Sequence, residues 1–189
     1  LDLSNSEISS CQNGIDFYQG DHLLNNVSVE NTSDKALYGT GNANITAEGL
    51  FFSDGDIGFA FTGETDVNIT NSTFQNFSGA GIKNIFIEPI GRLPEPEDEE
   101  IYLSNSLITN NNYGLILERN SYGNINNNAI YGNSAAAWTN SDEEEPTLNF
   151  ENNWWGSPTG PYHYFYNTSG EGDILETAEN NDEVHVVVL

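Results

Sequence analysis

Short runs of alternating apolar and polar residues recur along the whole chain, and each run ends in a polar bend. The segment 103–117, LSNSLITNNNYGLIL, nearly repeats the segment 3–17, LSNSEISSCQNGIDF. Alternation is typical of strands with one buried face. The motif apolar–x–Asn–Ser/Asn–x–apolar, followed by Gly–apolar, divides the chain into about seven units that start about 21 to 25 residues apart, except for one lengthened unit. We therefore predict a repeat architecture.

The period fits one rung of a parallel β-helix, in which three short strands and three bends form each turn. Leucine-rich repeats share the period, but their Leu-x-x-Leu-x-Leu signature is missing. A helical repeat is excluded because apolar spacings of three and four are never sustained. The pattern predicts an all-β, single-stranded parallel β-helix (β-solenoid) of about seven rungs.

An asparagine recurs at the expected bend of several units, as Asn5, Asn71, Asn105, Asn127 and Asn152. Asn, Ser and Gly tolerate the backbone conformations that tight bends require. Stacked side-chain amides can hydrogen-bond from rung to rung. We interpret these residues as an internal structural ladder rather than as a ligand site.

The segment 152–161, NNWWGSPTGP, resembles the Asn-x-Trp-Gly…Gly-Pro signature near the carboxyl end of many archaeal and bacterial surface β-helix proteins. The likeness continues through Tyr162, His163, Asn167, Gly170 and Asp173, and ends before the terminal ENNDEVHVVVL. The resemblance implies a right-handed parallel β-helix with an extracellular habit, closed by this passage. It implies no single activity, since this fold carries lyases, hydrolases, epimerases, adhesins and fibre proteins.

We expect the β-helix repeats to occupy residues 1–161, followed by a closing segment and terminal strand over residues 162–189. Two acidic, proline-containing stretches, PIGRLPEPEDEE at 89–100 and NSDEEEP at 140–146, interrupt the repeats. Proline and a run of like charges are typical of exposed loops, so both are predicted to leave the solenoid.

The net charge of −25, with only four basic residues, argues against nucleic-acid binding and against docking on anionic lipids. No apolar run approaches the roughly 20 residues that span a bilayer, so no membrane insertion is expected. The acceptor pattern Asn-x-Ser/Thr favours an extracellular or cell-surface, N-glycosylated protein; it occurs at Asn26, Asn31, Asn44, Asn68, Asn71, Asn76 and Asn167.

Clusters of carboxylates are candidates for Ca²⁺, which takes six to eight oxygen ligands. The candidate ligands are Asp142, Glu143 and Asp173, although a charge run is more often simply solvated. Catalysis has thinner support. The aspartates cannot be shown to converge, and the three histidines, His22, His163 and His185, stand apart from any nucleophile pattern. No catalytic residue is predicted.

Aromatic residues are dense between Trp154 and Tyr166. They could form a sugar-stacking platform, but we favour a hydrophobic plug that covers the last rung.

The two ends of the sequence are apolar. Leu1 and Leu3 stand directly inside a rung, and Val184, Val186, Val188 and Leu189 form a β-prone terminal run. Two interpretations stay open: the run folds back onto its own solenoid, or it pairs with a neighbouring copy in a head-to-tail filament. The sequence thus favours a structural or adhesive surface protein that self-associates. The alternative is a carbohydrate-active or carbohydrate-binding β-helix protein, with glycans as partners.

Overall fold

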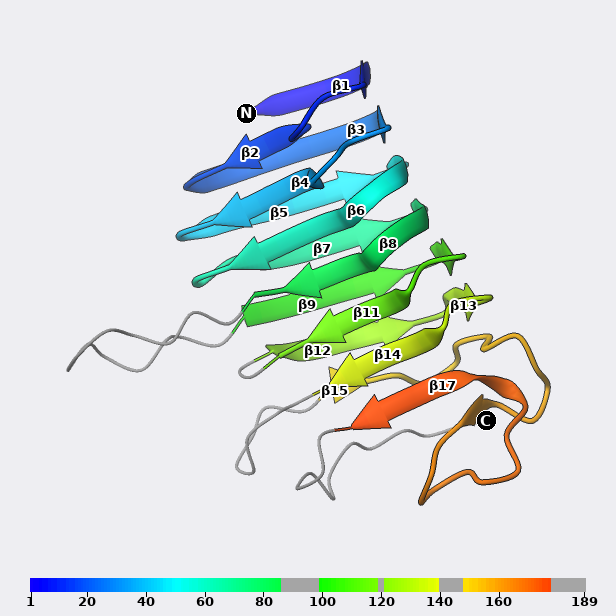
Figure 1. Cartoon of the computed structure of the whole chain (residues 1–189). Coiled ribbons are helices and arrows are strands. Elements are labelled where there is room, and N and C mark those ends of the chain that lie inside the picture. The colour runs from blue at the N-terminus through cyan, green and yellow to red at the C-terminus, as the bar shows by residue number, and fades with distance from the viewer. Residues whose placement is uncertain (86–98, 119–120, 140–147, 178–189) are drawn as a thin grey trace, which may run out of the picture.

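The computed structural model describes residues 1–85, 99–118, 121–139 and 148–177. Within them the chain is all-β and forms a parallel β-solenoid of about six turns, without helices. Figure 1 shows the turns stacked from the N-terminus to the last coloured strand. The predicted fold is confirmed. The unit count differs slightly, because seven bends enclose only six complete turns.

Each turn has three faces. The first face contains the first half of β1 (Asp2–Ser9), the first half of β3 (Gly20–Glu30), β5 (Ala43–Glu48), β7 (Asp66–Thr70), β9 (Glu99–Ser104), β12 (Ser121–Asn126) and β15 (Leu148–Asn149). All neighbours on this face pair in parallel.

The second face is short. It contains the second halves of β1 and β3, the starts of β6 (Phe51–Thr62) and β8 (Thr73–Asn84), then β10 (Leu107–Thr109) and β13 (Ala129–Tyr131). The third face contains β2 (Ile15–Phe17), β4 (Lys35–Thr40), the ends of β6 and β8, β11 (Tyr113–Leu117), β14 (Ala135–Thr139) and β17 (Gly172–Thr177). The two-residue strand β16 (Pro161–Tyr162) pairs with β17.

Residues with a left-handed backbone conformation (positive φ) form two of the three bends in each turn. The first corner, between the first and second faces, has positive φ at Asn5, Asn26, Gly49, Asn71, Asn105, Asn127 and Asn152. The second corner, between the second and third faces, has positive φ at Ser10, Asn31, Asp54, Asn76, Asn110, Gly132 and Gly156. Asn and Gly adopt this region at low cost, which explains their recurrence in the repeat.

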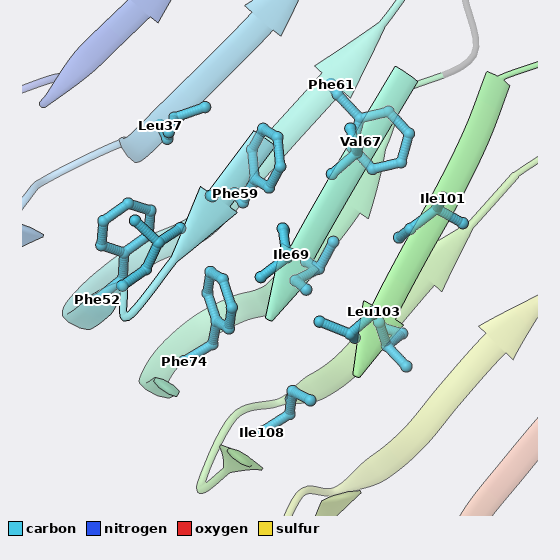
Figure 2. Packing of buried hydrophobic residues seen from close by; sticks show 14 of the residues in the cluster. Leu37, Phe52, Phe59, Phe61, Val67, Ile69, Phe74, Ile101, Leu103 and Ile108 are labelled. Carbon is cyan, nitrogen blue, oxygen red and sulfur yellow. The ribbon is translucent and has the colours of Figure 1, made fainter. Parts of the chain in front are cut away.

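The core is a continuous stack of apolar side chains along the solenoid axis (Figure 2). Its largest fully buried members include Phe52, Phe59, Phe61 and Phe74. In-register pairing places like positions on top of each other, as with Phe52 and Phe74, whose ring centroids lie 5.5 Å apart. Burial of these side chains is the main favourable contribution to folding.

The glycine of the repeat motif marks a close approach between turns. A Cβ atom at Gly14 would lie 2.3 Å from the carbonyl oxygen of Ala36, and one at Gly114 would lie 2.3 Å from that of Ala136. No larger residue fits there without moving the backbone of the next turn. The described part of the chain also holds no helix that could cross a membrane.

Candidate functional site

A shallow, widely open groove of about 820 Å³ runs parallel to the solenoid axis along the first corner. It spans four turns and is lined by Asn71, Ser72 and Thr73, by Asn105, Ser106 and Leu107, by Asn127, Asn128 and Ala129, and by Asn152 and Trp154. Each turn contributes its left-handed corner asparagine and residues that follow it. The groove is therefore a direct product of the repeat.

The lining alternates between exposed amides and a flat, mostly apolar strip. The corner residues Asn71, Asn105, Asn127 and Asn152 are all exposed. The strip is the outward row of the second face, where Thr73, Leu107 and Ala129 are in register. Trp154 continues this row through a bridge to Ala129 and is 47 % exposed. An indole surface thus stands at the C-terminal end of a row of carboxamides.

A ladder of inward polar side chains supports the groove from inside. Its members are the buried Ser72, Ser106 and Asn128 and the partly buried Asn153, each directly after a corner asparagine. The hydroxyl of Ser106 accepts from the Ser72 backbone N–H at 3.1 Å, and the Asn128 Oδ1 accepts from the Ser106 N–H at 3.0 Å. The Asn153 Oδ1 accepts from the Asn128 N–H at 2.9 Å. Every rung of the groove is therefore tied to the next one.

The amide nitrogens of this ladder make further bonds. The Asn128 Nδ2 donates to the Leu103 carbonyl at 2.9 Å and to the Asn153 Oδ1 at 3.1 Å. The Asn153 Nδ2 donates to the carbonyls of Ile125 and Phe150. Buried polar groups that are fully hydrogen-bonded rigidify their surroundings.

This ladder corrects one prediction. The asparagines expected to form the ladder do share a corner, but all five are exposed. The inward ladder is formed by the residues that directly follow them in the sequence. The reason is geometric: the left-handed residue turns its side chain outward at the bend, and the next residue points inward. In the sequence, the recurring Asn-Ser and Asn-Asn pairs of the repeat motif were the signal that could have identified this ladder.

A second buried ladder lies beneath the second corner. The Asn111 Oδ1 accepts from the Phe77 N–H at 3.0 Å, and the Asn133 Oδ1 accepts from both the backbone N–H and the Nδ2 of Asn111 at 3.0 Å. Asp173 ends the series. Its carboxylate accepts from the Asn133 N–H at 2.7 Å, from the Asn133 Nδ2 at 3.1 Å and from the Gly132 N–H at 3.1 Å.

Asp173 was one of the calcium candidates, and here it replaces the next amide of a structural ladder. The other two candidates, Asp142 and Glu143, lie outside the described residues, as do most of the loop 89–100 and the loop 140–146. Among the described residues, no group of three or more His, Cys, Asp or Glu side chains is placed to hold a metal ion. A calcium site stays a prediction.

The glycosylation candidates are mostly accessible. Asn26, Asn31, Asn44, Asn68, Asn71 and Asn76 are exposed. Asn167 is only partly exposed, and its Nδ2 donates to the carbonyls of Thr159 and Pro161 at 2.8 Å. Six of the seven acceptor amides therefore face solvent.

The aromatic segment divides between the two predicted roles. Trp155 is 2 % exposed and packs against Phe150 and the core, as a plug should. Trp154 faces the groove, and the turn residues Tyr164, Phe165 and Tyr166 are 70 %, 74 % and 56 % exposed. The plug prediction is wrong for these four residues, because each side chain is 47 % or more exposed and so is not packed as a buried plug.

His163 organises that turn. It is 4 % exposed, and its Nδ1 accepts from the backbone N–H groups of Phe165 at 3.2 Å and Tyr166 at 3.1 Å. Burial lowers the pKa of His163 below its usual value. Burial and the two bonds that Nδ1 accepts both favour the neutral ring with its proton on Nε2.

A pair of carboxylates lies at the other end of the first face, away from the groove. The Glu100 backbone N–H donates to the Asp66 carboxylate, and the Tyr102 hydroxyl donates to the Glu100 carboxylate. Burial is the main cause that raises the pKa of Asp66; the bond from Glu100 opposes it and the Glu100 charge adds to it. Asp66 opens β7, whereas the groove begins after the last residue of that strand.

The residues proposed for assembly are only partly described. Leu1 is 65 % exposed, and Leu3 is partly buried against the core. Val184, Val186, Val188 and Leu189 lie outside the described residues. Head-to-tail association stays a prediction.

A family model for the right-handed β-helix region matches residues 1–154 of this chain. No curated protein and no solved structure matches it. The match covers the rungs that carry the groove, including Trp154 at its end.

Proposed function

Because the chain belongs to the right-handed β-helix family, we propose that it is an extracellular, non-catalytic domain that binds glycan chains along the first corner. The observation that carries this proposal is the groove in which exposed carboxamides repeat turn by turn beside an apolar strip that ends at Trp154. The role is adhesive, in keeping with the surface function that the sequence favours.

The chemistry of the lining fits a sugar chain. Each carboxamide of Asn105, Asn127 and Asn152 offers both a donor and an acceptor, as paired sugar hydroxyls require. The exposed indole of Trp154 offers a broad apolar face with a polar edge, which suits the C–H face of a pyranose ring. Neighbouring turns repeat at about 4.8 Å, so one amide per turn can contact a chain that lies along the axis.

The buried ladders support binding by fixing the groove in advance. Asn128 and Asn153 tie the backbone directly beneath Asn127 and Asn152. A surface that is already ordered loses little conformational freedom when the ligand docks. The groove can therefore bind through a few modest hydrogen bonds and one stacked ring.

Charge selects the type of glycan. The chain carries a net charge of −25, and the groove lining contains amides, hydroxyls and apolar groups but no basic residue. A uronate or sulfated polymer would be repelled. We expect a neutral polysaccharide.

The lining also argues against hydrolysis at this site. Glycoside cleavage generally uses two carboxyl groups on either side of the scissile bond. The residues that line the groove include no Asp or Glu. The raised pKa of Asp66 belongs to the opposite end of β7, which separates it from the ligand path.

A glycan array followed by titration calorimetry tests the proposal. Wild-type protein should bind neutral oligosaccharides and reject uronate oligomers of the same length. Trp154→Ala should weaken binding at least about fivefold, since stacking on an aromatic ring contributes about 1 kcal/mol or more. Tyr164→Ala removes an even more exposed aromatic outside the groove and should bind like wild type. Equal losses in the two variants, or an array without any neutral ligand, would contradict the proposal.

Self-association is a second, compatible proposal. The apolar side chains of the first turn favour it: Leu1 is exposed, and Leu3 and Ile8 are only partly buried although they contact the core. A further turn from a second copy would bury them. Sedimentation and electron microscopy of the full chain, with and without Val184–Leu189, test this. Unchanged assembly in the shortened chain would exclude a role for that run.

A further inference from the structure

The outward row of the second face determines the chemistry of the first corner. This row consists of Glu7, Ser28, Phe51, Thr73, Leu107, Ala129 and Trp154, and each member stands two residues after a first-corner residue. The third residue of a glycosylation acceptor stands at the same distance from its asparagine. One row therefore forms the groove floor and also decides which corner asparagines are acceptors.

The row changes character within the groove. Ser28 and Thr73 make acceptors of Asn26 and Asn71, whereas Glu7 and Phe51 make none in their own turns. Leu107, Ala129 and Trp154 leave Asn105, Asn127 and Asn152 as bare amides. Among the residues that line the groove, the change from hydroxyl to apolar falls between Thr73 and Leu107.

Asn71 is the acceptor at that boundary. It is exposed, has a φ of 52° and lines the N-terminal end of the groove. Its Nδ2 donates to the Glu48 Oε1 of the preceding turn at 3.1 Å, so the amide points along the axis towards that turn, just beyond the N-terminal end of the groove. A group attached to Nδ2 would stand across the path of any ligand that extends beyond this turn.

We propose that Asn71 carries an N-linked glycan that closes the N-terminal end of the groove and limits the length of bound ligand. The limit on ligand length rests on the proposed function, whereas the modification of Asn71 does not. In the modification, Nδ2 forms a C–N bond to the anomeric carbon of an oligosaccharide activated as a phosphate-linked carrier. The carrier phosphate leaves with the bonding electrons, and the amide loses one proton. The remaining N–H can still donate to Glu48.

The chain offers a closely matched control. Asn76, an acceptor at the second corner of the same turn, is also exposed, has a φ of 62°, and donates through Nδ2 to the Asp54 carboxylate of the preceding turn at 3.2 Å. It does not line the groove. Asn71→Gln and Asn76→Gln therefore remove equivalent glycans from inside and outside the ligand path.

The experiment uses the full chain from a host that performs N-glycosylation. Glycopeptide mass spectrometry should find Asn71 occupied in wild type and in Thr73→Ser, which keeps the acceptor, and bare in Thr73→Ala. Binding is then measured with a series of neutral oligosaccharides of increasing length. Asn71→Gln and Thr73→Ala should bind the longest members several-fold more tightly than wild type. Asn76→Gln, at a residue outside the groove, should match wild type at every length.

The outcomes separate the two proposals. A bare Asn71 in wild type overturns the modification. An occupied Asn71 with no length-dependent gain in Asn71→Gln overturns the limit on ligand length, while Trp154-dependent binding keeps the proposed function. Absence of Trp154-dependent binding overturns the proposed function and with it the limit, whereas occupancy at Asn71 would still support the modification.

Discussion

The same corner is built differently in the early and late turns of this solenoid. In the second and third turns, the inward residue after the first-corner bend is Val27 or Leu50, both buried in the apolar core. From the fourth turn onward the equivalent residues are Ser72, Ser106, Asn128 and Asn153, which hydrogen-bond from turn to turn. At the second corner, the residue after the bend changes from Phe77 in the fourth turn to Asn111 and Asn133 in the next two turns.

The difference shows that one bend can be stabilised by two kinds of chemistry. Apolar side chains fill space without specifying partners, so they hold the turn through packing alone. Amide ladders satisfy backbone groups at defined positions and fix the rungs relative to each other. The groove extends over the turns that have the polar ladder, as the proposed binding of an extended chain requires.

Asn128→Leu should produce the largest effect, because it replaces a polar ladder residue by an apolar one of the kind found at Val27 and Leu50. The Ser106 N–H and the Leu103 carbonyl would lose bonds in a buried setting. We expect a loss of about 3 kcal/mol in the free energy of unfolding, since each buried group without a partner costs about 1 to 3 kcal/mol. Urea denaturation measures it. Asn127→Gly, at the exposed neighbour, is the control and should stay within about 0.5 kcal/mol; a similar loss there would refute the ladder's importance.

Leu50→Asn makes the reverse exchange and should cost less, about 2 kcal/mol. Leu50 and Asn128 occupy equivalent positions in different turns. The new amide would therefore lie within reach of the Val27 N–H and the Leu24 carbonyl, which correspond to the Ser106 N–H and the Leu103 carbonyl beside Asn128. Leu50→Ala offers no such bonds and leaves a cavity, so it should cost about 3 kcal/mol. Both values come from the same denaturation series. If the asparagine is clearly worse than the alanine, the two corner chemistries are not interchangeable.

Asp173→Ala should cost about 2 kcal/mol, because Gly132 and Asn133 together lose three bonds at the end of the second ladder. Glu171→Ala, an exposed neighbour, should be nearly neutral. Thermal unfolding with and without a calcium chelator separates the ladder role from the calcium hypothesis. A chelator-dependent midpoint in wild type that disappears in Asp173→Ala would identify Asp173 as a calcium ligand; a midpoint independent of chelator supports the ladder.

The smallest effect is expected from pH at His163. Its pKa is lowered in the folded chain by burial, so the unfolded chain takes up the proton first as the pH falls below about 6.5. The stabilisation by His163 is therefore complete above that pH and is lost as the pH falls towards the folded-state pKa. His163→Asn keeps an acceptor in place of Nδ1 but does not titrate.

Unfolding free energies at about pH 7.5 and about pH 5.5 test this prediction. Between the higher and the lower pH, the free energy of unfolding should fall more for wild type than for His163→Asn. Comparison of the two proteins cancels the relief of carboxylate repulsion, which acid produces in both. A difference that does not depend on pH would contradict the prediction.

The sequence by itself determined the architecture. Apolar alternation, the recurring Asn at a bend and the Gly before an apolar residue each reflect a local requirement: a buried strand face, a left-handed residue, and a close approach such as Gly114 to Ala136. These requirements repeat with the turn, so a single chain reveals them. The asparagines of the Asn-x-Ser/Thr motif could also be identified from the sequence, because the motif is local.

Only the tertiary structure decided which polar residues lie inside and which line a surface. The outward direction of Asn127 and the inward direction of Asn128 follow from a bend whose side-chain directions the residue pattern does not state. The place of Asp173 under Asn133 depends on β17 returning beside β14, a contact between residues 40 apart in sequence. Likewise, Trp154 and Trp155 are adjacent in sequence, yet one faces the groove and the other the core, because strand geometry sends neighbours to opposite sides.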